Sequence, residues 1–237
     1  MNLLLFFYDL SQAAQMLRIV RSRAKKQRFS VVVFNPDSGP SSGANQQAWR
    51  EQIDKLREAG GHFVDFVAYL DLADKRGKPQ SLGLLTLQLD TYVLKFNVKR
   101  FWLDDAIEGD PSKDDKHQPK SGQGPFEKLL QNLCDARPAA HWSVSFANPG
   151  CPVGKNHPSF GRLCLCDWED ALSGYPGRTR GNTAVFFVSS PEFAAAAKSR
   201  AEKDLCGYIG FEDLANKGRS EYQCHFPGWL ESFLLSV

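Results

Sequence analysis

The sequence predicts an α/β protein that forms a single (β/α)8 barrel over residues 1–237. Eight short apolar runs alternate with segments whose apolar residues recur at helical spacing. Such alternation predicts parallel strands joined by right-handed crossovers. A length of 237 residues accommodates eight of these units in one domain. A doubly wound open sheet is the alternative, but no glycine-rich turn follows the first apolar run.

The predicted strands are apolar runs that end in polar or turn-forming residues. They cover residues 3–8, 29–34, 63–69, 100–105, 141–147, 163–168, 183–188 and 206–211. The predicted helices lie between them, at residues 13–20, 49–56, 82–96, 126–133 and 193–201, with a last helix at 229–234. No helical pattern separates the fifth strand from the sixth, so one helix is expected to be missing or shortened there. The polar stretch 108–124 is expected to be a loop insertion over the face that carries the active site.

Composition excludes several classes of function. A net charge of +2 gives no electrostatic footprint for nucleic acid. No apolar run approaches the roughly 20 residues of a membrane-spanning helix. The apolar start lacks a basic region and a small-residue cleavage site, so we expect no signal peptide in this chain. The six cysteines form no C-x-x-C pair and no zinc spacing, and they leave the disulfide state open.

Polar side chains gather where the predicted strands end. The fourth run ends on two adjacent acids, which suggests a site because α/β proteins place their chemistry at the carboxyl ends of strands. In a barrel, all such ends meet at one face. The candidate catalytic residues are Asp104, Asp105 and Glu169, and the candidate substrate-binding residues are Tyr8, Asn35, Asp37, Tyr69, Trp102, Asn148, Trp168 and Glu212.

Carboxylates beside aromatic rings suit sugar chemistry, in which one acid protonates the leaving oxygen and another stabilises or attacks the anomeric carbon. No G-x-S-x-G motif or calcium loop is present, and we expect no metal and no organic cofactor. Structural alternatives stay open. Asp105 could cap a following helix, Glu169 could be a helix N-terminal acid, and Asn148 could begin a plain turn.

Five motifs together resemble the spherulin-4-like family. They are Asn35-Pro36-Asp37-Ser38-Gly39-Pro40, Phe101-Trp102-Leu103-Asp104-Asp105, Asn148-Pro149-Gly150, Asp167-Trp168-Glu169, and the end of the chain from Gly207-Tyr208-Ile209-Gly210-Phe211-Glu212-Asp213 to Phe226-Pro227-Gly228-Trp229. The resemblance implies a TIM barrel related to fungal glycoside hydrolases that cut galactosaminogalactan, an exopolysaccharide containing α-1,4-linked N-acetylgalactosamine. It carries the essential acids onto Asp104, Asp105 and Glu169.

Two departures from the family stand out. Asp105 occupies a position where the family usually has Glu, and Tyr8-Asp9-Leu10 stands where the family has a Y-x-Y-P turn. The resemblance implies endo-acting hydrolysis of an amino-sugar polysaccharide. The Asp105 departure favours the alternative, which is a non-catalytic glycan-binding or surface protein on the same barrel. The resemblance implies a secreted or cell-surface location, although the missing signal peptide leaves a cytoplasmic one open. The sequence does not set the oligomeric state.

Overall fold

The computed structural model describes residues 2–36, 39–74, 78–104, 125–138, 142–147, 162–168, 183–203, 207–213 and 226–237. Within these ranges the side chains of 125–127, 147, 162–168 and 183–184 are not described. The chain divides into two compact units. The first comprises residues 1–37, 41–66 and 166–237, and the second comprises residues 38–40 and 67–165, so the division falls inside two strands. Each unit is described by itself below.

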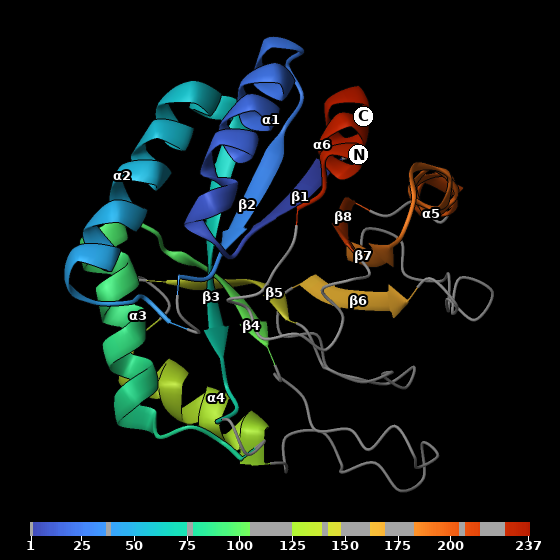
Figure 1. The fold of residues 1–237 in the computed structure, drawn as a ribbon. Coiled ribbons are helices and arrows are strands. Elements are labelled where there is room, and N and C mark those ends of the chain that lie inside the picture. The colour runs from blue at the N-terminus through green and yellow to red at the C-terminus, as the bar shows by residue number, and fades with distance from the viewer. Residues whose placement is uncertain are drawn as a thin grey trace, which may run out of the picture. The chain divides into compact units, whose positions relative to one another are not determined.

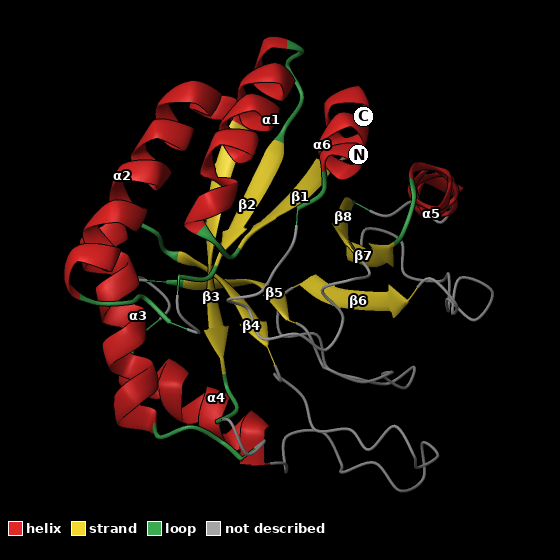
Figure 2. Cartoon of the chain, in the orientation of Figure 1, coloured by secondary structure: helices red, strands yellow, loops and turns green. Residues whose placement is uncertain are grey.

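The first unit contains a four-stranded parallel sheet. Its strands are β1 (Asn2–Phe7), β2 (Ser30–Phe34), β7 (Thr183–Val188) and β8 (Tyr208–Asp213). Their order is β7-β8-β1-β2, and every neighbouring pair is parallel. Figure 2 shows β1 and β2 running in the same direction. The strands are apolar along almost their whole length because helices cover one face and further side chains pack on the other.

Among its described residues, the first unit also has four α-helices and two short 3₁₀ turns. They are η1 (Leu10–Gln12), α1 (Ala13–Lys25), α2 (Gly43–Gly60), η2 (Gly61–Phe63), α5 (Pro191–Lys203) and α6 (Gly228–Ser236). Figure 1 shows α1 between α2 and α6, and α1 packs against both. Side chains of α1 also bind the last part of the chain. The guanidinium of Arg18 pairs with Glu231 at 2.6 Å, and Gln15 donates to the Phe226 carbonyl at 3.2 Å.

The second unit also has four parallel strands in sequential order. They are β3 (Val64–Asp71), β4 (Arg100–Asp104), β5 (Ser143–Ala147) and β6 (Arg162–Trp168). The first three residues of β3 and the last three of β6 belong to the first unit. In the described part of this unit, two helices accompany these strands. They are α3 (Leu82–Phe96) and α4 (Pro125–Ala136), and they pack against each other. Ser81 caps α3, and Asn97 ends it in the left-handed conformation that a helix C-terminus favours.

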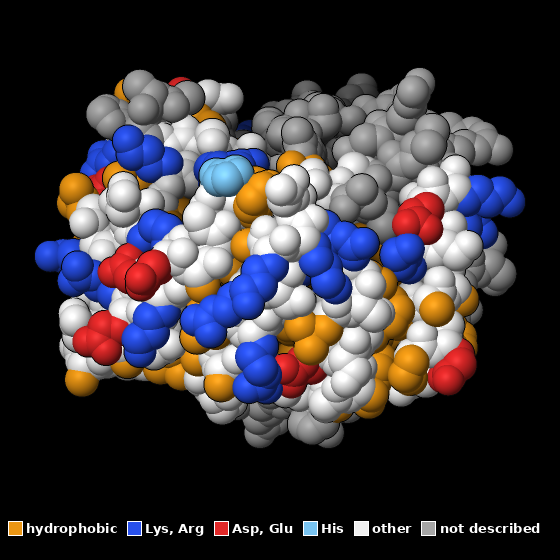
Figure 3. Space-filling view, turned by 90° about the horizontal axis from the view of Figure 1, so that it is seen from above, with side chains coloured by type: hydrophobic (Ala, Val, Ile, Leu, Met, Phe, Trp, Pro, Cys, Tyr) orange, Lys and Arg blue, Asp and Glu red, His pale blue; other side chains and the backbone are white. Residues whose placement is uncertain are grey.

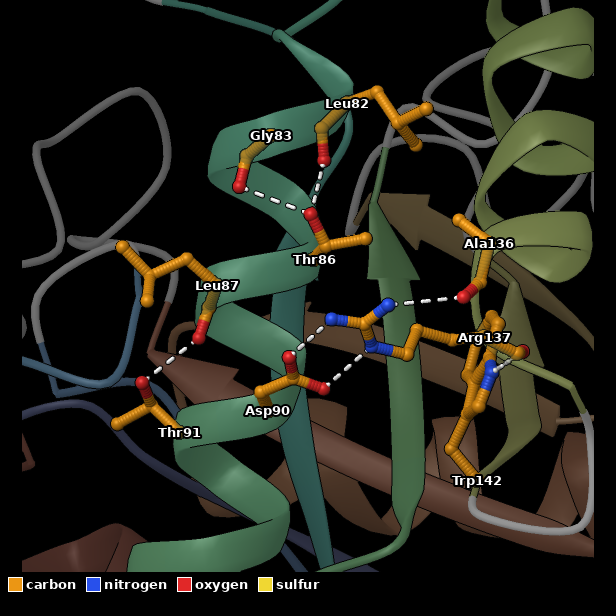
Figure 4. Close-up of polar contacts among 9 residues, drawn as sticks. All are labelled: Leu82, Gly83, Thr86, Leu87, Asp90, Thr91, Ala136, Arg137 and Trp142. Atoms are coloured by element: carbon orange, nitrogen blue, oxygen red, sulfur yellow. Dashed lines mark hydrogen bonds and ion pairs between the residues drawn. The ribbon is translucent and has the colours of Figure 1, made fainter.

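An ion pair fastens α3 to the end of α4. Arg137 forms a bidentate ion pair with Asp90, with Nε 2.8 Å from Oδ1 and Nη2 2.6 Å from Oδ2 (Figure 4). The Asp90 contact raises the pKa of the Arg137 guanidinium. The Arg137 carbonyl in turn accepts a hydrogen bond from the indole of Trp142 at 2.5 Å. Because Trp142 directly precedes β5, this chain of contacts fixes where that strand begins.

All eight predicted strands are present, each within two residues of its expected start, and the parallel α/β class is confirmed. The closed eight-stranded barrel and its single-domain organisation stay predictions. The expected shortened helix between the fifth and sixth strands falls on residues 148–161, and the polar insertion falls on 108–124. Both lie outside the described residues.

Candidate functional site

Side chains in the first unit alternate between the helices and the opposite face of the sheet. Phe7 packs on Trp49 of α2, with ring centroids 4.6 Å apart, and Phe211 packs edge-on against Phe233 of α6 at 5.1 Å. Successive residues of a strand point to opposite faces. Tyr8 and Glu212 therefore lie on the face away from the helices, which we call the inner face.

On this inner face Tyr8 and Glu212 meet. The Tyr8 hydroxyl donates a hydrogen bond of 3.3 Å to Glu212 Oε1. Asn35 lies beside Tyr8, because the Asn35 backbone N–H donates to the Phe7 carbonyl at 3.1 Å and so extends the pairing of β1 with β2 by one residue. Three predicted site residues from three separate segments are thus brought together at the carboxyl end of one sheet.

The Asn35 side chain is buried and has no hydrogen-bond partner among the described residues. Its residue is 1% exposed, and neither its amide nitrogen nor its amide oxygen is paired. An unpaired buried amide is costly, on the order of 1–3 kcal/mol, and calls for an explanation.

A glycine makes room for the aromatic ring below this cluster. A Cβ added to Gly210 would lie 2.7 Å from Cε2 of Phe6, closer than real Cβ contacts. The Phe6 ring lies 5.7 Å from that of Tyr8, so it supports the Tyr8 ring from beneath. The sequence reasoning missed Phe6 and Gly210. A glycine inside a strand was the available signal, because such a glycine often marks a close approach.

The Asp9 side chain binds the backbone of the following turn and is not part of this cluster. Its carboxylate accepts from the Ser11 N–H at 2.7 Å and caps η1. The Gln12 side chain, which is buried, accepts from the backbone N–H groups of Tyr8 and Asp9 at 3.2 and 3.3 Å. Gln12 therefore fixes the backbone that carries Tyr8, and sequence reasoning missed this role as well.

The second unit repeats the alternation. Phe101 contacts Tyr92 of α3 with ring centroids 6.0 Å apart and Trp142 at 5.8 Å, so it faces the helix side. Trp102 consequently points to the opposite, inner face of this sheet, where its ring lies 5.7 Å from that of Phe146. Trp102 is 3% exposed, and this burial makes it a wall of the site rather than an open stacking platform.

Tyr69 and Asp104 share that inner face. Tyr69 lies opposite Trp102 in the ladder between β3 and β4, and Asp71 lies opposite Asp104. The Tyr69 hydroxyl donates a hydrogen bond to Asp104 Oδ2. Asp71 instead accepts from the backbone N–H of Ala73 at 2.8 Å, which organises the turn after β3. The structure therefore places one predicted catalytic acid in contact with one predicted binding residue.

The remaining predicted site residues are not described. Asp37, Asp105, Asn148 and Glu169 lie outside the described residues, and Trp168 is described only as a backbone position in β6. Within the described ranges, no group of three His, Cys, Asp or Glu side chains could hold a metal ion. None of the helices in those ranges combines the length and apolarity needed to cross a membrane.

Comparison with known proteins gives a likeness of fold alone. No family model and no curated protein matches the chain. Among solved structures, it is similar to active domain 2 of a chitinase from Pyrococcus furiosus in its catalytic-site mutants, with a TM-score of 0.54 at 10% identity. It is also similar to the catalytic domain of a hyperthermophilic chitinase from the same organism, with a TM-score of 0.53 at 10% identity. Both alignments cover 99% of this chain and 93% of the other. The chain thus shares the fold of these chitinase domains.

Proposed function

We propose that this protein is an endo-acting glycoside hydrolase that cleaves an amino-sugar exopolysaccharide rich in α-1,4-linked N-acetylgalactosamine. The observation that carries the proposal is the hydrogen bond from Tyr69 to Asp104 on the inner face of β3 and β4. The likeness of fold to chitinase domains and the resemblance of the motifs to the spherulin-4-like family support it. A secreted or cell-surface location is part of the proposal, because the substrate lies outside cells.

The Tyr69 donor gives Asp104 a defined role. The Tyr69 hydroxyl donates to Asp104 Oδ2, and this contact fixes the direction in which the carboxylate points. We propose that Asp104 stabilises positive charge in the oxocarbenium-like transition state, or orients the N-acetyl group of the substrate if that group participates. Asp105 or Glu169 would be the general acid that protonates the leaving oxygen.

The proposal includes closure of the eight strands into a (β/α)8 barrel, in which all strand ends share one face. Asn35 and the pair of Tyr8 with Glu212 would then contact sugar hydroxyls. These groups combine donors and acceptors, which is what a saccharide hydroxyl needs. Trp168 would supply apolar surface for the sugar rings, whereas the buried Trp102 packs against Phe146.

A product assay tests the proposal. The wild-type chain is incubated with defined polysaccharides, including acetylated and deacetylated galactosamine oligomers, and the product masses are measured. Shortened oligomers are expected from the wild type, and none from Asp104→Asn or Glu169→Gln at unchanged circular dichroism. Asp90→Asn is the matched control, because it removes a carboxylate that pairs with Arg137 away from the site. Full turnover by Asp104→Asn would refute its role.

A glycan-binding protein without turnover is the second candidate, and one observation favours it. Asp105 is one methylene shorter than the Glu that the spherulin-4-like family usually has there, so its carboxylate reaches less far. Asp105→Glu separates the two candidates. If oligomers bind the wild type unchanged and only Asp105→Glu shortens them, the natural chain is a binding protein. If the wild type cleaves them, the hydrolase proposal stands.

A further inference from the structure

A hollow lies in the first unit, at the amino-terminal ends of its strands. It has a volume of about 290 Å³. Leu3 of β1 and Ile209 of β8, which are register partners, form its apolar floor, and Phe211 lines it as well. Phe211 faces the helices, so this hollow lies on the helix side of the sheet. From Leu3 to Tyr8 the chain advances about 16 Å, so the hollow is remote from the candidate site.

Among the side chains that line this hollow, cations outnumber anions. Arg23, Arg28 and Lys198 line it, and Glu202 is the carboxylate among its lining side chains. Lys198 pairs with Glu202 at 2.7 Å and so cancels that charge. Figure 3 shows the molecule from above the view of Figure 1, and several Lys and Arg side chains lie on this face with Asp and Glu side chains among them.

Arg23 differs from an ordinary surface arginine because its side chain is buried. It is 3% exposed, and its guanidinium donates to Ser30 Oγ at 2.8 Å and to the Phe29 carbonyl at 3.1 Å, both neutral acceptors. It makes no ion pair in the described part of the chain. Burial, and secondarily the charge of Arg28, lower its pKa to about 10. A buried charge of this kind is costly unless it is paired.

The hydrogen bonds of the arginines leave donors for a ligand. A guanidinium carries five N–H groups, and two of those of Arg23 are used. The Arg28 guanidinium donates to the Val237 carbonyl, which holds it at the rim beside the end of α6. Planar arginine forks match the oxygens of a phosphate group, and a lysine adds a mobile point charge.

We propose that this hollow binds the phosphate group of a small phosphorylated molecule, with Arg23 at its base and Arg28 and Lys198 at its rim. A volume of about 290 Å³ is near the lower end for small-molecule sites, and it leaves space for a small organic group beside the phosphate. The proposal does not depend on the function proposed for the other end of the strands.

Calorimetric titration of the full chain with inorganic phosphate and with a hexose 6-phosphate tests the proposal, at constant ionic strength maintained with chloride. Saturable binding of at least one of the two is expected, together with a rise in Tm that grows with ligand concentration. Tighter binding of the sugar phosphate would identify an organic ligand, and equal or tighter binding of phosphate would identify the free anion. No binding of either, or an equal effect of chloride, would overturn the proposal.

Substitutions locate the binding. Arg23→Gln should weaken the affinity about ten- to a hundredfold, the worth of a charge-assisted hydrogen bond. Arg21→Gln is the matched control, because Arg21 is exposed on the same helix and does not line the hollow. Lys198→Gln, at a partly exposed position, should weaken binding as well and gives a second test that does not disturb a buried residue. Unchanged affinity in both Arg23→Gln and Lys198→Gln would refute this location.

Discussion

The Tyr69 hydroxyl donates a hydrogen bond to the carboxylate of Asp104, and the two residues come from neighbouring parallel strands. Tyr69 stands opposite Trp102, two residues before Asp104, so the contact runs diagonally across one face of the sheet. An acid at a strand end is commonly left to solvent or to a helix cap. In this protein the hydroxyl of the buried Tyr69 holds the Asp104 carboxylate instead.

Tyr69→Phe should lower kcat/KM by about ten- to a hundredfold on any substrate that the wild type cleaves, because a hydrogen bond to a charged group is worth about 1.5–3 kcal/mol. The ring, and with it the packing, is kept. Tyr92→Phe is the control, since Tyr92 lies on α3 and meets the helix-facing Phe101. Steady-state kinetics of both variants measure this effect. An equal loss of kcat/KM in the two variants would contradict a positioning role for Tyr69.

Asn35→Leu should separate stability from ligand binding. The buried amide has no partner in the described chain, so replacing it with an apolar side chain of similar shape is expected to leave Tm unchanged or to raise it. Affinity for a sugar ligand should fall about tenfold if the amide contacts a hydroxyl. Thermal unfolding and calorimetric titration measure the two effects. A large loss of stability would show that the amide has a structural role.

Gly210→Ala should destabilise the first unit by about 1–3 kcal/mol through overpacking, because the new methyl group would meet the Phe6 ring. Gly228→Ala is the matched control. A Cβ at Gly228 meets nothing within 4 Å, and the residue opens α6, so a neutral or slightly stabilising effect is expected. Chemical denaturation of the two variants provides the comparison. Equal stability of the two variants would mean that the Phe6 ring moves aside freely.

The ion pair between α1 and α6 should make stability depend on pH. The hydrogen bond from Arg18 is the largest cause of the lowered pKa of Glu231. A lowered pKa means that the contribution is complete above the ordinary value of 4.5 and disappears as the pH falls through the lower folded value. Glu231→Gln should therefore reduce Tm at neutral pH, and the difference should shrink well below pH 4.5.

Glu58→Gln serves as the control for that pH series. Glu58 is exposed on α2 and makes no ion pair in the described part of the chain, so its substitution should change Tm little at any pH. A Glu231→Gln difference that persisted undiminished in acid would point to packing rather than to charge.

The strands were predictable because each apolar run is short, and turn-forming residues end most of them. The run from Val31 to Phe34 is buried throughout, as a strand covered on both faces should be. The candidate site was predictable in part. Polar residues after strands identified Tyr8, Asn35, Tyr69 and Asp104, and the structure joins Tyr69 to Asp104 and sets Asn35 beside Tyr8.

Other features depend on contacts that a linear pattern does not contain. Asp9 lies just beyond the end of β1, and Asp104 is the last residue of β4, yet Asp9 caps η1 because the next residues turn at once into a helix. Arg23 fits the basic end of a helix, and only its packing against the start of β2 shows that it is buried. Its neighbour Arg21 carries the same charge and is exposed.

The strict alternation in β1 and β8 has a consequence for engineering. Phe7 and Phe211 hold the helices, while Tyr8 and Glu212 face the other way. A library that varies only the second pair can explore new ligand preferences without loosening the outer layer. Deleting a single residue upstream in β8 would place Glu212 where Phe211 now packs against α6, and it would move the Phe211 ring to the inner face.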